Sequence, residues 1–183
     1  MDHVSIACRG LIGVVFLLSA ASKITSRAAA VEFFGVIRRL LRIFAGQPWA
    51  TRSATKATGF AVISMELAVP FALAIPSLAR LGFGTALVAL LMFSCAIAAA
   101  IHRGVRMSCA CFGRSTTPLG VPHLVRNGIL SVAAITGLVL GAGRPVTASP
   151  QALLVPVLAA LVTALVLIRF DDLVDLFKPR ARL

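Results

Sequence analysis

Two cysteines one residue apart, Cys109 and Cys111, are the side chains in this sequence best suited to chemistry. They stand in the segment Cys109-Ala110-Cys111-Phe112-Gly113, between two long apolar stretches. A Cys-X-Cys pair can close a small, strained disulfide ring, and strained disulfides are usually labile and oxidising. The pair therefore indicates thiol–disulfide exchange or soft-metal binding, because lipid packing requires neither thiol.

The residues around the pair favour reactivity. Arg106 and Arg114 bring positive charge close to the thiols. Such charge favours the thiolate, which is the form that attacks disulfides and binds metal ions. Gly113 permits a tight turn, and Phe112 can anchor that turn in the membrane interface. We therefore expect Cys109 and Cys111 to be the catalytic residues, with these neighbours in supporting roles.

Soft-metal binding is the main alternative for the same segment. Thiolate, thioether and imidazole groups together suit copper(I) or zinc. The sequence has no second cysteine pair, so a closed tetrahedral site needs both flanking histidines. The candidate ligands are Met107, Cys109, Cys111, His102 and His123. A further alternative is a structural subunit of a membrane complex, in which the cysteines have no chemical role.

Composition identifies the class of protein. Of 183 residues, 59% are hydrophobic and 13% are charged, whereas soluble domains are nearer ~45–50% apolar. A chain this short cannot hide so much apolar surface in one globular core. The net charge of +12 does not indicate nucleic-acid binding, because no long soluble segment exists to carry such a fold. Cations that flank membrane helices and meet anionic lipid explain it instead.

The apolar runs predict an all-α fold, a polytopic transmembrane helical bundle in one integral membrane domain over residues 1–183. Each run is long enough to cross a bilayer. Four core spans and a fifth are expected at about 4–21, 57–76, 78–101, 123–142 and 151–170.

The first run has a second interpretation. Its uninterrupted part, Leu11 to Ala21, has the length of a signal peptide and follows Arg9. Because the whole stretch from Val4 can span a bilayer and the following chain is also apolar, we favour a span.

The long loop over 22–56 predicts an amphipathic helix in the membrane interface. Apolar residues recur there at helical spacing with arginines between them, which is typical of such helices. The apolar set is Val31, Phe33, Phe34, Ile37, Leu40, Leu41 and Phe44, and the arginines are Arg38, Arg39 and Arg42.

Three polar residues lie in or beside the expected spans. Glu66 is the only acid within a span, and such carboxylates are costly and usually face a bundle interior or a cavity. It can relay protons, contact Lys23, or form a structural hydrogen bond with a neighbouring Ser or Thr. Asn127, near the start of the fourth span, can bond across helices.

Charge and parity predict which face carries the cysteines. With five spans, the first loop, the Cys-X-Cys loop and the C-terminal tail share one face. That face holds 15 of the 18 cations, and only Arg9, Arg80 and Arg144 lie on the other. The positive-inside rule then predicts that the cysteines of a multi-pass plasma-membrane protein face the cytoplasm.

Several motifs together resemble the MauE family of methylamine-utilisation membrane proteins, within the wider DoxX-like group. They are Phe16-Leu17-Leu18-Ser19-Ala20-Ala21-Ser22-Lys23, Glu66-Leu67, the Cys109 to Gly113 segment and Arg126-Asn127. The resemblance covers the chain from the first span to the fourth.

The resemblance implies thiol–disulfide exchange at Cys109 and Cys111 in the maturation of an exported protein, beside a thioredoxin-like partner. It implies an extracytoplasmic cysteine pair, in conflict with the charge count. The arrangement is also similar to vitamin K epoxide reductase-like proteins, which pass electrons between thiols and quinone, so a quinone is a possible cofactor. Those relays use a second cysteine pair in the first loop, and residues 22–56 contain no cysteine. A partner protein would have to supply it.

Overall fold

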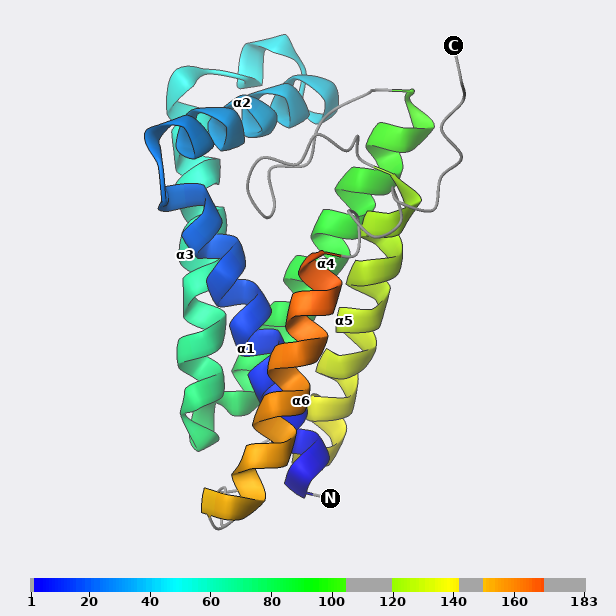
Figure 1. Cartoon of the computed structure of the whole chain (residues 1–183). Coiled ribbons are helices and arrows are strands. Elements are labelled where there is room, and N and C mark those ends of the chain that lie inside the picture. The colour runs from blue at the N-terminus through cyan, green and yellow to red at the C-terminus, as the bar shows by residue number, and fades with distance from the viewer. Residues whose placement is uncertain (1, 105–119, 142–149, 170–183) are drawn as a thin grey trace, which may run out of the picture.

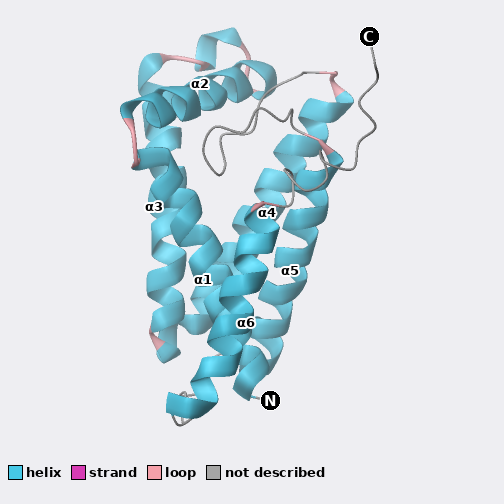
Figure 2. Cartoon of the chain, viewed as in Figure 1, coloured by secondary structure: helices cyan, strands magenta, loops and turns pink. Residues whose placement is uncertain are grey.

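The computed structural model describes residues 2–104, 120–141 and 150–169 of the chain (Figure 1). Within these residues the backbone forms helices and no strand (Figure 2). In chain order the elements are α1 (Asp2–Ile24), α2 (Arg27–Phe44), the 3₁₀ turn η1 (Gln47–Trp49), α3 (Arg52–Ala74), the 3₁₀ turn η2 (Pro76–Leu78), α4 (Ala79–His102), α5 (Val121–Gly141) and α6 (Pro150–Ile168).

In the described parts of the chain, four helices are long and apolar enough to cross a membrane. They are His3–Ile24, Arg52–Ala74, Pro76–His102 and Val121–Leu140. This result confirms the predicted all-α polytopic bundle. The second span begins at Arg52, five residues earlier than expected, because the hydroxyl of Thr51 caps the helix by accepting from the backbone N–H of Ala54 at 3.1 Å.

The fifth expected span falls on α6, which has 19 residues and an apolar stretch over Leu154–Leu167. This helix lies along α1 (Figure 1). A Cβ added to Gly10 would lie 3.0 Å from the Cβ of Ala160, so the two helices approach closely there. The outer face of α6 is apolar, with Val155 and Val162 exposed, as expected where a helix meets lipid.

The bundle interior is centred on α1. Ile12 and Phe16 of that helix are buried against Val69 of α3, Phe83 of α4 and Leu130 of α5. Small residues let the backbones approach, as is usual between membrane helices. The buried alanines of this central cluster are Ala86, Ala89, Ala134, Ala160 and Ala164.

The predicted amphipathic helix of the first loop is α2, which lies across one end of the bundle (Figure 1). Phe33 and Ile37 are buried and pack with Ile63 of α3, whereas Arg38 and Arg42 face outward. Ser26 caps the helix by accepting from the backbone N–H of Ala29 at 3.1 Å. We call this end of the molecule the α2 end.

Helices α1, α4 and α6 run toward the α2 end, and α3 and α5 run away from it (Figure 1). The first loop, the C-terminal end of α4 and the start of α5 therefore lie at one end of the bundle. Successive helices of the four candidate spans therefore run in alternating directions, and α6 follows them as a shorter apolar helix.

Candidate functional site

The whole predicted catalytic segment and its nearest neighbours lie outside the described residues. These are Arg106, Met107, Cys109, Cys111, Phe112, Gly113 and Arg114. The described structure does include their flanking helices and five other predicted residues. Those five are Lys23, Glu66, Asn127, His102 and His123.

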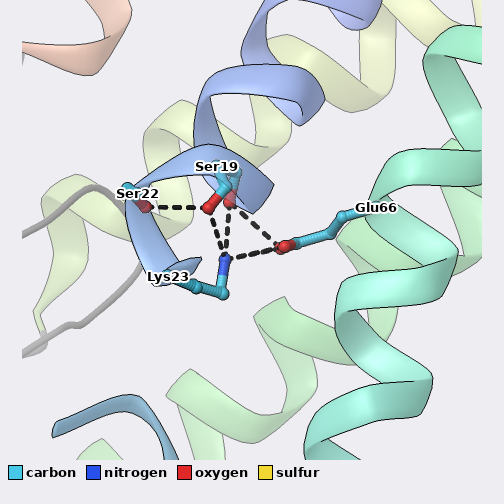
Figure 3. A network of polar contacts seen from close by, with 4 residues as sticks. All are labelled: Ser19, Ser22, Lys23 and Glu66. Atoms are coloured by element: carbon cyan, nitrogen blue, oxygen red, sulfur yellow. Dashed lines mark hydrogen bonds and ion pairs between the residues drawn. The ribbon is translucent and has the colours of Figure 1, made fainter. Parts of the chain in front are cut away.

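The structure brings Lys23 and Glu66 together inside the bundle (Figure 3). The Nζ of Lys23 lies 2.8 Å from each carboxylate oxygen of Glu66. Their side chains are 3% and 2% exposed, respectively, so the ion pair is almost completely shielded. It joins α1 to α3.

Ser19 completes this network, one helical turn before Lys23. Its hydroxyl donates to Oε1 of Glu66 at 3.0 Å and accepts from Nζ of Lys23 at 2.8 Å, and its carbonyl accepts from the same Nζ at 3.1 Å. The hydroxyl of Ser22 donates to that carbonyl at 2.7 Å. Both charged groups therefore have several partners, which a buried ion pair needs to offset its desolvation.

Local sequence explains how each element positions its group. Ser19 and Lys23 are four residues apart, so they lie on the same face of α1. Lys23 is in the last turn of that helix, where a cation is favoured by the helix dipole. Glu66 shares the buried face of α3 with Ile63 and Val69.

Phe33 of α2 covers the network from the α2 end. The ammonium of Lys23 lies 5.4 Å from the centre of its ring, within the range of a cation–π contact. The interfacial helix thus contacts the polar site directly.

The start of α5 supplies a second group of buried polar side chains. His123, Arg126 and Asn127 are all 5% exposed or less. The Nδ2 of Asn127 donates to the hydroxyl of Ser94 at 3.3 Å, and that hydroxyl donates to the carbonyl of Leu90 at 2.7 Å. Asn127 therefore bonds across helices, from α5 to α4.

A small cavity connects the two polar groups. Its volume is about 30 Å³, and its lining includes Ser19, Glu66, Phe93, Arg126 and Asn127. This volume is enough for about one water molecule.

Both flanks of the Cys-X-Cys segment lie at the α2 end, and the first of them contacts α2. Arg103, just after α4, donates a hydrogen bond to the carbonyl of Ile43, and its guanidinium lies 5.1 Å from the ring centre of Phe44. On the other side, α5 begins at Val121 and reaches the cavity with Arg126. The chain thus enters this segment beside α2, and α5, which follows the segment, reaches the polar site.

The described cysteines are both free thiols. Cys8 is buried and lines an apolar groove between α1 and α6, while Cys95 is exposed on α4. Residues 2–104, 120–141 and 150–169 contain no group of three or more His, Cys, Asp or Glu side chains that could hold a metal ion. Three of the five proposed metal ligands lie outside those ranges.

Sequence reasoning did not assign a site role to Ser19, Arg126 or Ser94. The four-residue spacing of Ser19 and Lys23 was a usable signal for the first of these. Nothing in the sequence indicated that Ser94 would face Asn127, because this contact depends on the rotation of two separate helices.

The fold and the polar interior define a multi-pass helical membrane protein with a buried ionic site at one end of its bundle. The chain belongs to the MauE family: the family described as methylamine utilisation protein MauE matches residues 1–140. The match confirms the resemblance seen in the motifs and includes α1 to α4 and nearly all of α5, whereas α6 lies beyond it. No curated protein and no solved structure matches the chain.

Proposed function

We propose that this protein supports thiol–disulfide redox chemistry in the maturation of a partner protein, with Cys109 and Cys111 as the reacting thiols. The observation that carries the proposal is the buried Lys23–Glu66 site at the end of the bundle to which the Cys-X-Cys segment is attached. Membership of the methylamine-utilisation family supports a role in maturation. Methylamine itself is not required as a substrate.

The proposed exchange proceeds through a mixed disulfide. A client thiolate attacks one sulfur of the Cys109–Cys111 disulfide and releases the other as a thiolate. The second client thiolate then breaks the mixed disulfide, so the client gains a disulfide and the pair becomes a dithiol. The pair thereby accepts two electrons, and the client loses two electrons and two protons.

Reoxidation of the Cys109–Cys111 dithiol then passes those two electrons on to a second acceptor. We assign this step to the disulfide of a thioredoxin-like partner, which becomes a dithiol, or to a membrane quinone, which becomes a quinol. The absence of cysteine from residues 22–56 supports an external partner. An internal relay of the vitamin K epoxide reductase type needs a second pair in that loop.

Lys23, Glu66 and Asn127 act as positioning residues in this proposal. A buried pair that joins α1 to α3 fixes the α2 end, and Asn127 ties α5 to α4 beside it. In this proposal, these links keep the end of α4 and the start of α5, which flank the Cys-X-Cys segment, in fixed positions relative to each other.

The experiment is a thiol-oxidation assay with the purified full chain in detergent. The probe is a fluorogenic dithiol peptide, and a soluble quinone or an oxidised thioredoxin is supplied as the acceptor. We expect Cys109→Ser and Cys111→Ser each to abolish catalysed peptide oxidation, while the matched Cys95→Ser variant retains it. A double variant, Cys109→Ser with Cys111→Ser, that oxidises the peptide at the wild-type rate would overturn the proposal.

The same preparations test the soft-metal alternative. Stoichiometric copper or zinc that is lost in the double variant, together with no peptide oxidation by the wild-type protein, would replace the redox proposal with metal handling.

A further inference from the structure

A groove of about 520 Å³ lies between α2 and the first turns of α3, on the outer surface of the α2 end. Four cations line it, two from each helix, and no acid is among its lining residues. Aromatic side chains from both helices form its apolar part. The cations are Arg27, Arg38, Arg52 and Lys56, and the aromatic residues are Phe34 and Phe60.

Specific packing builds the floor of this groove. The ring of Phe34 lies directly over Gly59, where an added Cβ would be 2.3 Å from Cε1 of that ring. Phe34 also meets Phe60 edge-on, with ring centres 5.7 Å apart. Phe60 is 59% exposed and continues the floor onto the outer face of α3. The groove therefore opens from a cationic rim onto an apolar membrane-facing surface.

The positions of the cations are not explained by helix stability. Arg27 and Arg52 are the first residues of α2 and α3, and Lys56 follows one turn later. Cations in a first turn are disfavoured by the helix dipole, which carries positive charge at that end. Within the described residues, none of the four forms an ion pair with an acid. Two helix N-termini and four side-chain charges thus produce a concentrated positive field.

We propose that this groove binds one anionic phospholipid. Its phosphate would lie among Arg27, Arg38, Arg52 and Lys56, and an acyl chain would follow Phe60 along α3. The charge of the rim requires an anion, and the apolar floor at the membrane interface requires a ligand with a hydrocarbon part. A free phosphate satisfies only the first of these conditions.

The test measures lipid binding to the purified full chain in detergent micelles by native mass spectrometry. The probes are phosphatidylglycerol, and phosphatidylcholine as a zwitterionic lipid. We expect a clear preference for phosphatidylglycerol. A double variant, Arg38→Gln with Arg52→Gln, should bind it about 25-fold more weakly, at about fivefold for each cation removed near the surface.

A matched control changes the same number of charges outside the groove. Arg39 and Arg42 are exposed on α2 and do not line it. Arg39→Gln with Arg42→Gln should leave phosphatidylglycerol affinity within about twofold of wild type. Equal weakening by the two double variants would overturn the proposal, because net charge alone would then explain binding. Equal affinity of the wild-type protein for the two lipids would overturn it as well.

A second variant fills the groove without changing charge. An added Cβ at Gly35 meets nothing within 4 Å, so Gly35→Leu places its side chain in open space, in a helix that favours leucine over glycine. We expect the affinity of this variant for phosphatidylglycerol to fall at least tenfold. Unchanged affinity would contradict binding of the lipid in this groove. Finally, glycerol 3-phosphate should not compete with the lipid. Competition at a similar concentration would identify a phosphate site and overturn the lipid assignment.

Discussion

Lys23 and Glu66 are 43 positions apart in the sequence, yet the Nζ of Lys23 lies 2.8 Å from both carboxylate oxygens of Glu66. The contact joins α1 to α3 in the interior of a bundle whose outer faces are apolar. Removing one partner from a buried ion pair leaves the other charge uncompensated, which is a large cost. This pair therefore makes the fold sensitive to a single substitution at either residue.

Separate removal of either charge should strongly destabilise the protein. We expect Lys23→Met and Glu66→Leu each to lower the free energy of unfolding by about 3–5 kcal/mol. The double variant should be much less destabilised than the sum of the two, because it leaves no unpaired charge. Equilibrium unfolding in mixed detergent micelles measures all three. Additive effects in this double-mutant cycle would contradict the direct pairing.

Ser19 should contribute less than either charge but more than an ordinary helix serine. Its hydroxyl contacts both members of the ion pair, and hydrogen bonds to charged groups contribute about 1.5–3 kcal/mol. Ser19→Ala should therefore destabilise the protein by about that amount. Ser131 is a suitable control, because its hydroxyl donates at 2.8 Å to the carbonyl of Asn127 in its own helix. If Ser131→Ala lowers the free energy of unfolding as much as Ser19→Ala does, the hydrogen bonds of Ser19 to the ion pair add no extra stability.

Adding one methyl group at Gly137 should destabilise the bundle. A Cβ there would lie 2.2 Å from Cζ of the buried Phe83, so either that ring or the packing of α5 against α4 would have to shift. We expect Gly137→Ala to cost about 1–3 kcal/mol, as overpacking usually does, and Phe83→Leu to relieve part of that cost in the double variant. Gly128→Ala is the matched control on α5, where an added Cβ meets nothing within 4 Å. If Gly137→Ala leaves the free energy of unfolding unchanged, the helices are not packed this closely.

The two described cysteines should differ in their reaction with a lipid-soluble maleimide. Cys95 is exposed on the outer side of α4, whereas Cys8 is 8% exposed. In membranes, a protein that retains only Cys95 should label at least tenfold faster than one that retains only Cys8. Faster labelling of Cys8 would contradict the observed rotation of α1 in the bundle.

The sequence was sufficient to predict the helices, because each apolar run had to satisfy its backbone hydrogen bonds inside a membrane. The interfacial helix α2 was also predictable, since its arginines alternate with apolar residues at helical spacing. Contacts between helices were harder to predict from the sequence. The sequence allows Glu66 to pair with Lys23 and equally allows it to bond to a serine, and the structure contains both contacts.

The lipid groove could not be predicted from the sequence at all. It depends on Phe34 lying over Gly59, which fixes how α2 crosses α3. Helical periodicity assigns residues to a face of one helix, but it does not determine the crossing of two helices. For the same reason, the approach of Asn127 to Ser94 became visible only in three dimensions.

The central claim is that Cys109 and Cys111 form a redox-active pair, and cysteine labelling in cells tests it most directly. The protein would carry Cys8→Ser and Cys95→Ser, leaving only the Cys-X-Cys pair. A membrane-impermeant maleimide would be applied to intact and lysed cells, before and after mild reduction. We predict labelling that appears only after reduction, and the sample in which it appears identifies the membrane face. Full labelling of both cysteines without reduction, in intact or lysed cells, would contradict a resting disulfide and the proposed exchange.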